Sequence, residues 1–153
     1  MFKTRVTEML GIEYPLIAGT MAGLTLAEFV AAVGNAGALC CIPSASFETK
    51  EGLRDEIRKA KSLTDKPFGV NINLFPAVRP VSNEEYIDTC IEEGVKVIET
   101  SGRSPAPYVE RIKSAGLIAM HKCARVRDAL SAERAGVDLI EIVGTECGGH
   151  PSM

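Results

Sequence analysis

EEGVKVIET, residues 92–100, ends a helical pattern at Gly94 and passes directly into an apolar run. The same change recurs at Gly116 and at Gly136, so that the three glycines are 22 and 20 residues apart. A glycine that follows the last helical residue adopts the left-handed conformation without a Cβ clash, and a strand can begin at once. A spacing of about 20 residues accommodates one strand of ~5 residues and one helix of ~10 residues. The repeat therefore predicts consecutive strand–helix units.

Start signals mark several of the helices. Thr25 with Glu28, and Ser82 with Glu85, are typical of capping boxes, and Pro105 suits the first position of a helix. Periodic apolar residues predict two further helices, at 49–62 and 125–135, and the second carries Val126, Ala129 and Leu130 on one face. Short apolar runs bounded by turn residues lie before, between and after the helices, at 15–19, 38–42, 68–74, 96–100, 117–122 and 139–143.

The resulting order, six strands alternating with five helices, predicts an α/β fold with a parallel sheet. Two architectures satisfy it, an open doubly wound sheet and a (β/α)8 TIM barrel. A dinucleotide-binding Rossmann turn would carry G-x-G-x-x-G after the first strand, whereas the chain has GTMAG at 19–23. This favours a barrel that is incomplete here, because closure needs eight strands.

Length and composition exclude several classes of protein. The 153 residues suffice for one domain, and 46% of them are hydrophobic. The net charge of -3 gives no basic surface for nucleic acid or an anionic membrane. No apolar run reaches the ~18–20 residues that span a bilayer, and residues 1–9 lack the apolar core of a secretory signal. The five cysteines, an odd number without a C-x-x-C pair, argue against a disulfide framework and a zinc site. We therefore expect reduced thiols and a cytoplasmic protein.

Polar residues gather where the predicted strands end. Asn71 and Lys122 stand at two of these ends, and a Gly148-Gly149-His150 run follows the last strand. In parallel α/β folds, binding and catalysis collect at this edge. Each residue also has a simpler interpretation: Asn71 could pair with backbone, Lys122 could be a solvated charge, and His150 could be an exposed loop residue. Side chains alternate along a strand, so only one of His121 and Lys122 faces the axis, and we take Lys122 as the functional one.

The motifs along the chain resemble those of the nitronate monooxygenases, an FMN-dependent family long called 2-nitropropane dioxygenases. The similar stretches include TEMLGIEYPLI at 7–17, AVGNAG at 32–37, KPFGVN at 66–71, HKC at 121–123 and residues 126–138. The most specific is GTECGGHP at 144–151. The series covers essentially the whole chain, in order, and resembles the N-terminal part of the family.

The resemblance implies an FMN-binding TIM barrel with an added lid. It assigns the catalytic base to His150 and no role to a metal. In such enzymes the nitronate anion gives an electron to FMN, and O2 completes its conversion to a carbonyl compound and nitrite. Lys122 could stabilise negative charge near the pyrimidine end of the flavin. The cofactor-binding positions that the resemblance implies are Ala18, Gly19, Thr20, Met21, Asn71, Lys122 and Gly149.

Two departures from the family pattern matter. The last two strand–helix units and the lid, which would include the loops holding the FMN phosphate, have no counterpart in these 153 residues. Val143 also occupies a position that is commonly polar in the family. Two other functions therefore stay open: an FMN-dependent enoyl-acyl-carrier-protein reductase, which shares the barrel and the Gly-Gly-His loop, and a truncated fragment without catalysis.

The open edges of an incomplete barrel have a physical consequence. Without an opposite layer, whichever of Val70, Ile72, Ile98 and Ile140 point to the axis would be exposed. We therefore expect the isolated chain to be poorly stable, to self-associate and to bind FMN weakly or not at all.

Overall fold

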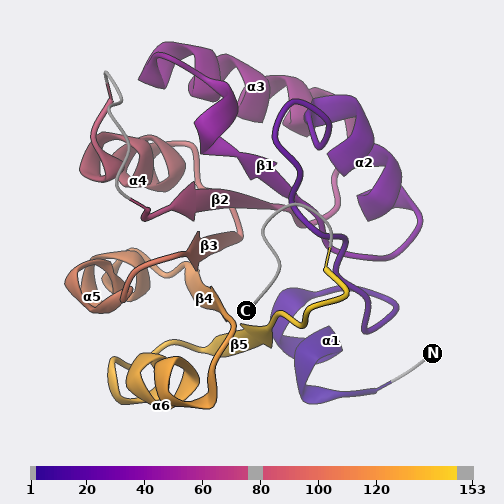
Figure 1. Ribbon diagram of the computed structural model, residues 1–153. Helices are drawn as coiled ribbons and strands as arrows, with labels where there is room; N and C mark the ends of the chain where they lie inside the picture. Colours follow the sequence, from indigo (N-terminus) through magenta and orange to yellow (C-terminus); the bar gives the residue numbers. More distant parts are fainter. Residues whose placement is uncertain (1–2, 76–80, 148–153) are drawn as a thin grey trace.

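One sheet of five parallel strands organises the structure, a computed structural model that describes residues 3–75 and 81–147 (Figure 1). The strands lie side by side in chain order: β1 (Cys41–Pro43), β2 (Gly69–Asn73), β3 (Val97–Ser101), β4 (Ile118–Cys123) and β5 (Leu139–Ile142). The helices are α1 (Arg5–Leu10), α2 (Ala27–Asn35), α3 (Lys50–Leu63), α4 (Asn83–Glu92), α5 (Ala106–Ser114) and α6 (Val126–Arg134), with a short 3-10 helix η1 (Ser44–Ser46) after β1. The fold is α/β, with alternating strands and helices as predicted.

The first predicted strand is much shorter than expected. Residues 15–19 form only one parallel bridge, between Ile17 and Leu39. Ala18 N–H donates to the Leu39 carbonyl at 2.8 Å, and Leu39 N–H donates to the Leu16 carbonyl at 3.0 Å. Pro15 has no N–H to donate, which limits the pairing on its N-terminal side. The segment still lies beside the chain that leads into β1, so the predicted order of elements holds.

Most of the predicted helix boundaries are confirmed. Gly94, Gly116 and Gly136 follow α4, α5 and α6 with φ of 61°, 78° and 88°, in the left-handed region that favours glycine. The capping box at α4 forms as predicted, because Glu85 N–H donates to Ser82 Oγ at 3.2 Å and Ser82 N–H donates to Glu85 Oε2 at 3.1 Å. These local signals decide where each helix ends and the next strand begins.

The capping box predicted at Thr25 is wrong. The buried Thr25 hydroxyl closes a turn instead, accepting from Met21 N–H at 3.1 Å and donating to the Met21 carbonyl at 3.2 Å. Helix α2 begins two residues later, with Leu26 at its N-cap and no side-chain cap. Its first N–H, that of Ala27, donates to Glu56 of α3 at 2.6 Å. A tertiary partner thus replaces the local one.

The sheet has two different faces. Figure 1 shows α2 to α6 along the outer side of the curved row of strands. The large core lies between these helices and the sheet, and it includes Val70, Ile72 and Ile98, all fully buried. These three residues therefore do not point to the axis, and the helices cover them. The axial face carries the alternate positions, and α1, which the sequence did not predict, packs there through Leu10 onto Leu39, Cys41, Val97 and Met120.

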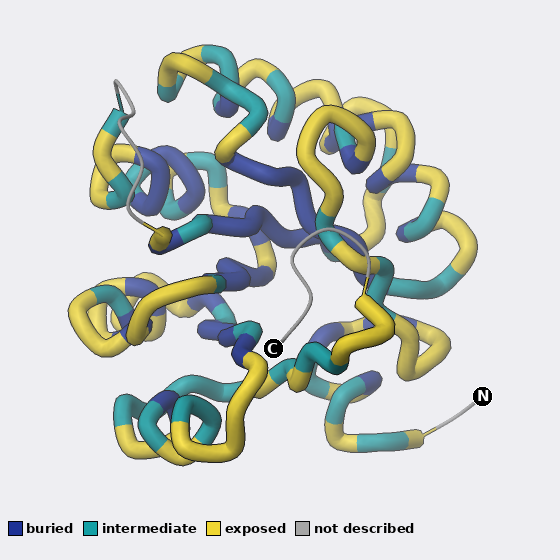
Figure 2. Tube along the Cα trace, viewed as in Figure 1, coloured by how far each residue is buried: buried dark blue, intermediate teal, exposed yellow. Residues whose placement is uncertain are grey.

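The edge at β5 is the least covered part of the sheet. Ile140 and Ile142 are 37% and 62% exposed, and Val126 and Leu130 of the adjacent α6 are 75% and 47% exposed. The apolar face predicted for this helix exists in the sequence, but only Ala132 is buried within it. Figure 2 shows the contrast between the buried central strands and this exposed end. Among the described residues, no helix is long and apolar enough to cross a membrane.

Candidate functional site

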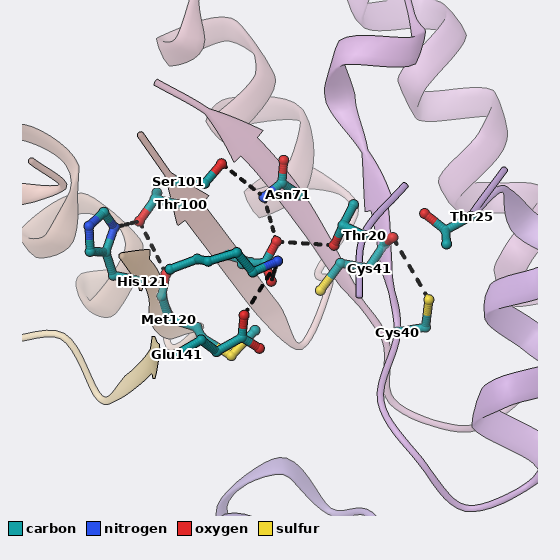
Figure 3. A network of polar contacts seen from close by, with 12 residues as sticks. Thr20, Thr25, Cys40, Cys41, Asn71, Thr100, Ser101, Met120, His121 and Glu141 are labelled. Carbon is teal, nitrogen blue, oxygen red and sulfur yellow. Dashed lines mark hydrogen bonds and ion pairs between the residues drawn. The ribbon is translucent and has the colours of Figure 1, made fainter. Parts of the chain in front are cut away.

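A polar cluster lies on the axial face of the sheet (Figure 3). Asn71 and Glu99 lie at the middle of β2 and β3, so that Asn71 does not stand at a strand end as predicted, and Lys122 lies close to the end of β4. Alternation along the strands brings Asn71 of β2, Glu99 of β3, Lys122 of β4 and Glu141 of β5 to this face. The register of the parallel strands places Asn71 opposite Glu99 and Lys122 opposite Glu141. Thr20 joins them from the loop before α2. The structure thus brings together three of the predicted positions, Thr20, Asn71 and Lys122.

Glu99 is the centre of this cluster, and the sequence analysis missed it. Its side chain is 1% exposed, yet three donors converge on its carboxylate. Lys122 Nζ lies 2.8 Å from Oε1, Thr20 Oγ1 donates to Oε2 at 3.0 Å, and Asn71 Nδ2 donates to the same oxygen. A signal was available, because an ionisable residue within an apolar strand needs a partner to offset its desolvation.

Lys122 also pairs with a second carboxylate. Glu141 Oε2 lies 3.4 Å from Lys122 Nζ, and both side chains are about one-fifth exposed. Burial lowers the pKa of Lys122, but the charges of Glu99 and Glu141 outweigh this and the pKa is raised overall. Burial, followed by the charge of Glu99, raises the pKa of Glu141 from 4.5 to about 7. The cluster therefore contains a permanent cation and a carboxyl group that exchanges a proton near neutral pH.

His121 points away from this cluster, as alternation predicts. It is buried, and its Nδ1 lies 2.9 Å from Thr100 Oγ1, which also donates to the Met120 carbonyl at 3.1 Å. Burial lowers the pKa of His121, which favours the neutral imidazole. These contacts fit a structural role for His121 within the sheet.

The loop at 18–21 offers exposed backbone beside the cluster. A Cβ placed on Gly19 would meet no atom within 4 Å, and Gly19 itself is exposed. None of the described residues accepts a hydrogen bond from the N–H of Gly19 or Thr20. Met21 is 41% exposed. A flat ligand could lie against this backbone and accept hydrogen bonds from it, with Lys122 and Asn71 nearby.

Other sequence-based candidates lie elsewhere. Gly149 and His150 fall outside the described residues. Asn73, a polar residue at the end of β2 that was not among the predicted positions, uses its side-chain oxygen to accept from Phe75 N–H at 2.9 Å. It lines a separate cavity of about 380 Å³, between the segments that follow β2 and β3, together with Ser82, Arg103 and Tyr108. Within residues 3–75 and 81–147, no group of three or more His, Cys, Asp or Glu side chains could hold a metal ion.

Comparison with known families assigns the chain. Residues 3–153 match the family model described as nitronate monooxygenase. The chain belongs to the nitronate monooxygenase family. Among curated relatives, a probable nitronate monooxygenase of Staphylococcus haemolyticus is 32% identical, with 97% of this chain and 50% of the relative covered. A probable nitronate monooxygenase of Staphylococcus aureus is 33% identical with the same coverage, so the chain spans about half the length of these relatives.

Solved structures share the fold of this chain. FabK from Thermotoga maritima matches with a TM-score of 0.92 and 35% identity, covering 100% of this chain and 48% of that one. A nitroalkane oxidase from Streptomyces ansochromogenes matches with a TM-score of 0.82 and 22% identity, covering 95% and 50%, and this likeness concerns the fold alone. The parallel sheet of this family member is thus part of a TIM-barrel type of fold, as the strand–helix alternation predicts.

Proposed function

We propose that the chain is part of an FMN-dependent oxidoreductase that oxidises alkyl nitronates with O2 to carbonyl compounds and nitrite. Family membership supports the class of reaction. The observation that carries the proposal is the polar cluster beside the exposed backbone at Gly19, where Lys122 supplies a positive charge and Asn71 an amide. FMN, a small-molecule nitronate or nitroalkane, and O2 are the partners this function requires.

The residues of this chain fit one end of a flavin. The space beside Gly19 admits a flat ring against the backbone, and the N–H groups of Gly19 and Thr20, which have no acceptor among the described residues, can donate to it. The Lys122 ammonium, which is paired with Glu99 and Glu141, can offset part of a negative charge on the ring. FMN supplies the redox chemistry when it is bound. Its phosphate would be held by segments that have no counterpart in this chain.

His150, preceded by Gly149, is the proposed base that removes the α-proton of a neutral nitroalkane. In the full-length enzyme, His150→Asn should lower turnover of the nitroalkane by about 10²–10⁴-fold, as expected for a lost general base. Oxidation of the preformed nitronate should fall much less, because its proton is already gone. Equal losses on both substrates would exclude this role for His150.

The flavin site has its own test. A full-length form should retain bound FMN after purification, seen as a flavin absorption band near ~450 nm, and should quench the fluorescence of added FMN. Gly19→Leu should weaken FMN binding and leave the melting temperature unchanged, because the space beside Gly19 is open. In a full-length form, Lys122→Met should make the bound flavin harder to reduce. A full-length form that binds no FMN would contradict the proposal.

A second candidate function stays in place because the identity to FabK, 35%, is as high as that to the probable nitronate monooxygenases, 32% and 33%. This candidate is an FMN-dependent enoyl-acyl-carrier-protein reductase, which needs NADH and an acyl carrier partner. The rate of NADH oxidation with and without an enoyl thioester separates the two. An increase with the thioester, without nitrite release from nitronates, would favour the reductase.

A further inference from the structure

Glu99 combines two properties that seldom occur together in a stable core. It is almost fully buried, with 1% of its side chain exposed, and it carries an acidic group. Its neighbours on the axial face, Val97 and Met120, belong to the apolar cluster beneath α1. Glu99 is therefore the deepest member of the polar cluster, directly above an apolar floor.

The two oxygens of Glu99 divide their contacts in an ordered way. Lys122 forms an ion pair with Oε1, whereas Thr20 and Asn71 both donate hydrogen bonds to Oε2. The partners come from β4, from the loop before α2 and from β2, and Thr20 is 79 residues from Glu99 in sequence. Asn71 also lies 3.4 Å from Ser101, Lys122 lies 3.4 Å from Glu141, and the Glu141 carboxyl group interacts with that of Glu99. Glu99 is thus the one partner that all three share among the described residues.

Fold stability alone is a weak reason for such an arrangement. Burying a carboxylate is offset only when its partners have good geometry, and an apolar group of similar volume is often at least as stabilising. The arrangement is better suited to holding several side chains in place, because each donor is fixed against one rigid acceptor. The three donors so fixed are those proposed to contact the flavin.

We propose that Glu99 is the positioning residue of this site, which fixes Thr20, Asn71 and Lys122 together and compensates the Lys122 charge. This inference rests on the proposed flavin site. Glu99 does not itself touch substrate or flavin, because it is buried and both of its oxygens are occupied. It acts through the three donors, so its loss should change their charge state and geometry.

Two variants of the 153-residue chain separate the effect of the Glu99 charge from the effect of the length of its side chain. Glu99→Gln keeps the shape and removes the charge, whereas Glu99→Asp keeps the charge and shortens the side chain by one methylene. Glu110→Gln, at an exposed position on α5, is the control for a lost glutamate. Two quantities are measured: the pKa of Lys122 by NMR of ¹³Cε-labelled lysine, and the FMN dissociation constant by fluorescence quenching. The Lys122 signal is identified by its absence in Lys122→Met.

The expected results differ between the variants. Glu99→Gln should lower the pKa of Lys122, because the main charge that raises it is gone. It should also weaken FMN binding about tenfold, equivalent to about 1.4 kcal/mol. Glu99→Asp should leave the pKa of Lys122 raised and still weaken FMN binding, because the shorter carboxylate cannot reach all three donors. Glu110→Gln should behave as the wild type in both measurements.

Two outcomes overturn the inference. Wild-type FMN affinity in both Glu99 variants would show that Glu99 positions nothing that matters to the flavin. A Lys122 titration unchanged in Glu99→Gln would show that Glu99 does not compensate the ammonium. This measurement decides even if the 153-residue chain binds no FMN, whereas the proposed function is tested separately by FMN binding to a full-length form. If Glu99→Gln does not fold, Glu99→Asp decides through its FMN affinity, since it keeps the charge balance of the cluster.

Discussion

The ion pair between Lys122 and Glu99 should couple strongly in the folded chain. The two charged atoms are 2.8 Å apart, and the side chains are only 22% and 1% exposed. Removing one partner of a fully buried pair typically destabilises by about 3–5 kcal/mol. Lys122 is partly exposed and Glu99 keeps Thr20 and Asn71 as donors. We therefore expect a coupling energy of about 2–3 kcal/mol, below the range for full burial.

A double-mutant cycle measures this coupling. Wild type, Lys122→Met, Glu99→Gln and the double variant are unfolded with urea at pH 8, in a fixed concentration of an osmolyte that keeps all four folded. Each single substitution should destabilise the chain, and the double variant should be more stable than the sum of the single effects predicts. The free energy of unfolding is the quantity compared.

An exposed pair of the same kind provides the matched control. Lys59 Nζ and Glu28 Oε1 are 2.6 Å apart, closer than the pair in the site, but the side chains are 50% and 65% exposed. Solvent screening should leave this pair with much weaker coupling despite its shorter distance. Equal coupling in the two cycles, or none between Lys122 and Glu99, would refute the argument that burial makes the site pair strong.

Three further predictions concern the stability of the chain. The pKa of Glu141 in the folded chain, about 7, lies above its ordinary 4.5. Its contribution to the free energy of unfolding is therefore fully present below about pH 4.5, and about 3 kcal/mol is lost as pH rises through 7. Glu141→Gln should remove this pH dependence from the free energy of unfolding measured in urea. Gly69→Ala would bring a Cβ within 2.9 Å of a β3 carbonyl oxygen and should destabilise by about 1–3 kcal/mol, whereas Gly19→Ala should not change the melting temperature. The chain should self-associate in sedimentation velocity through the exposed end of the sheet, and Val126→Lys with Ile142→Lys should make it monomeric; a monomeric wild type would contradict this.

Local signals predicted the framework of the fold because they act within a few residues. The glycines at 94, 116 and 136 end helices through their own φ angles, and the Ser82 capping box needs only Glu85. Such contacts do not depend on what lies across the molecule. Thr25 failed as a cap for the opposite reason, since its hydroxyl closes a turn to Met21 and the first helical N–H finds Glu56 on α3.

The candidate site could be predicted only in part. Asn71 and Lys122 were found because polar residues stand out against apolar runs. Glu99 lies in the same kind of position but inside the run 96–100, where it was taken as part of a buried strand. The four positions 69–72 of β2 are all buried, so neither face of that strand alternates with solvent. A strand covered on both faces gives no periodic signal for which side chains point to the axis.

The sequence by itself determined the family, the alternation of strands and helices, and the helix ends, because each is encoded in contiguous residues or in ordered motifs. Only the tertiary structure decided which faces of the strands meet, that α1 closes the axial face, and that Glu99 gathers Thr20, Asn71 and Lys122. Those contacts join residues up to 79 positions apart. They depend on strand register, which is set by the packing of the whole sheet and not by any one segment.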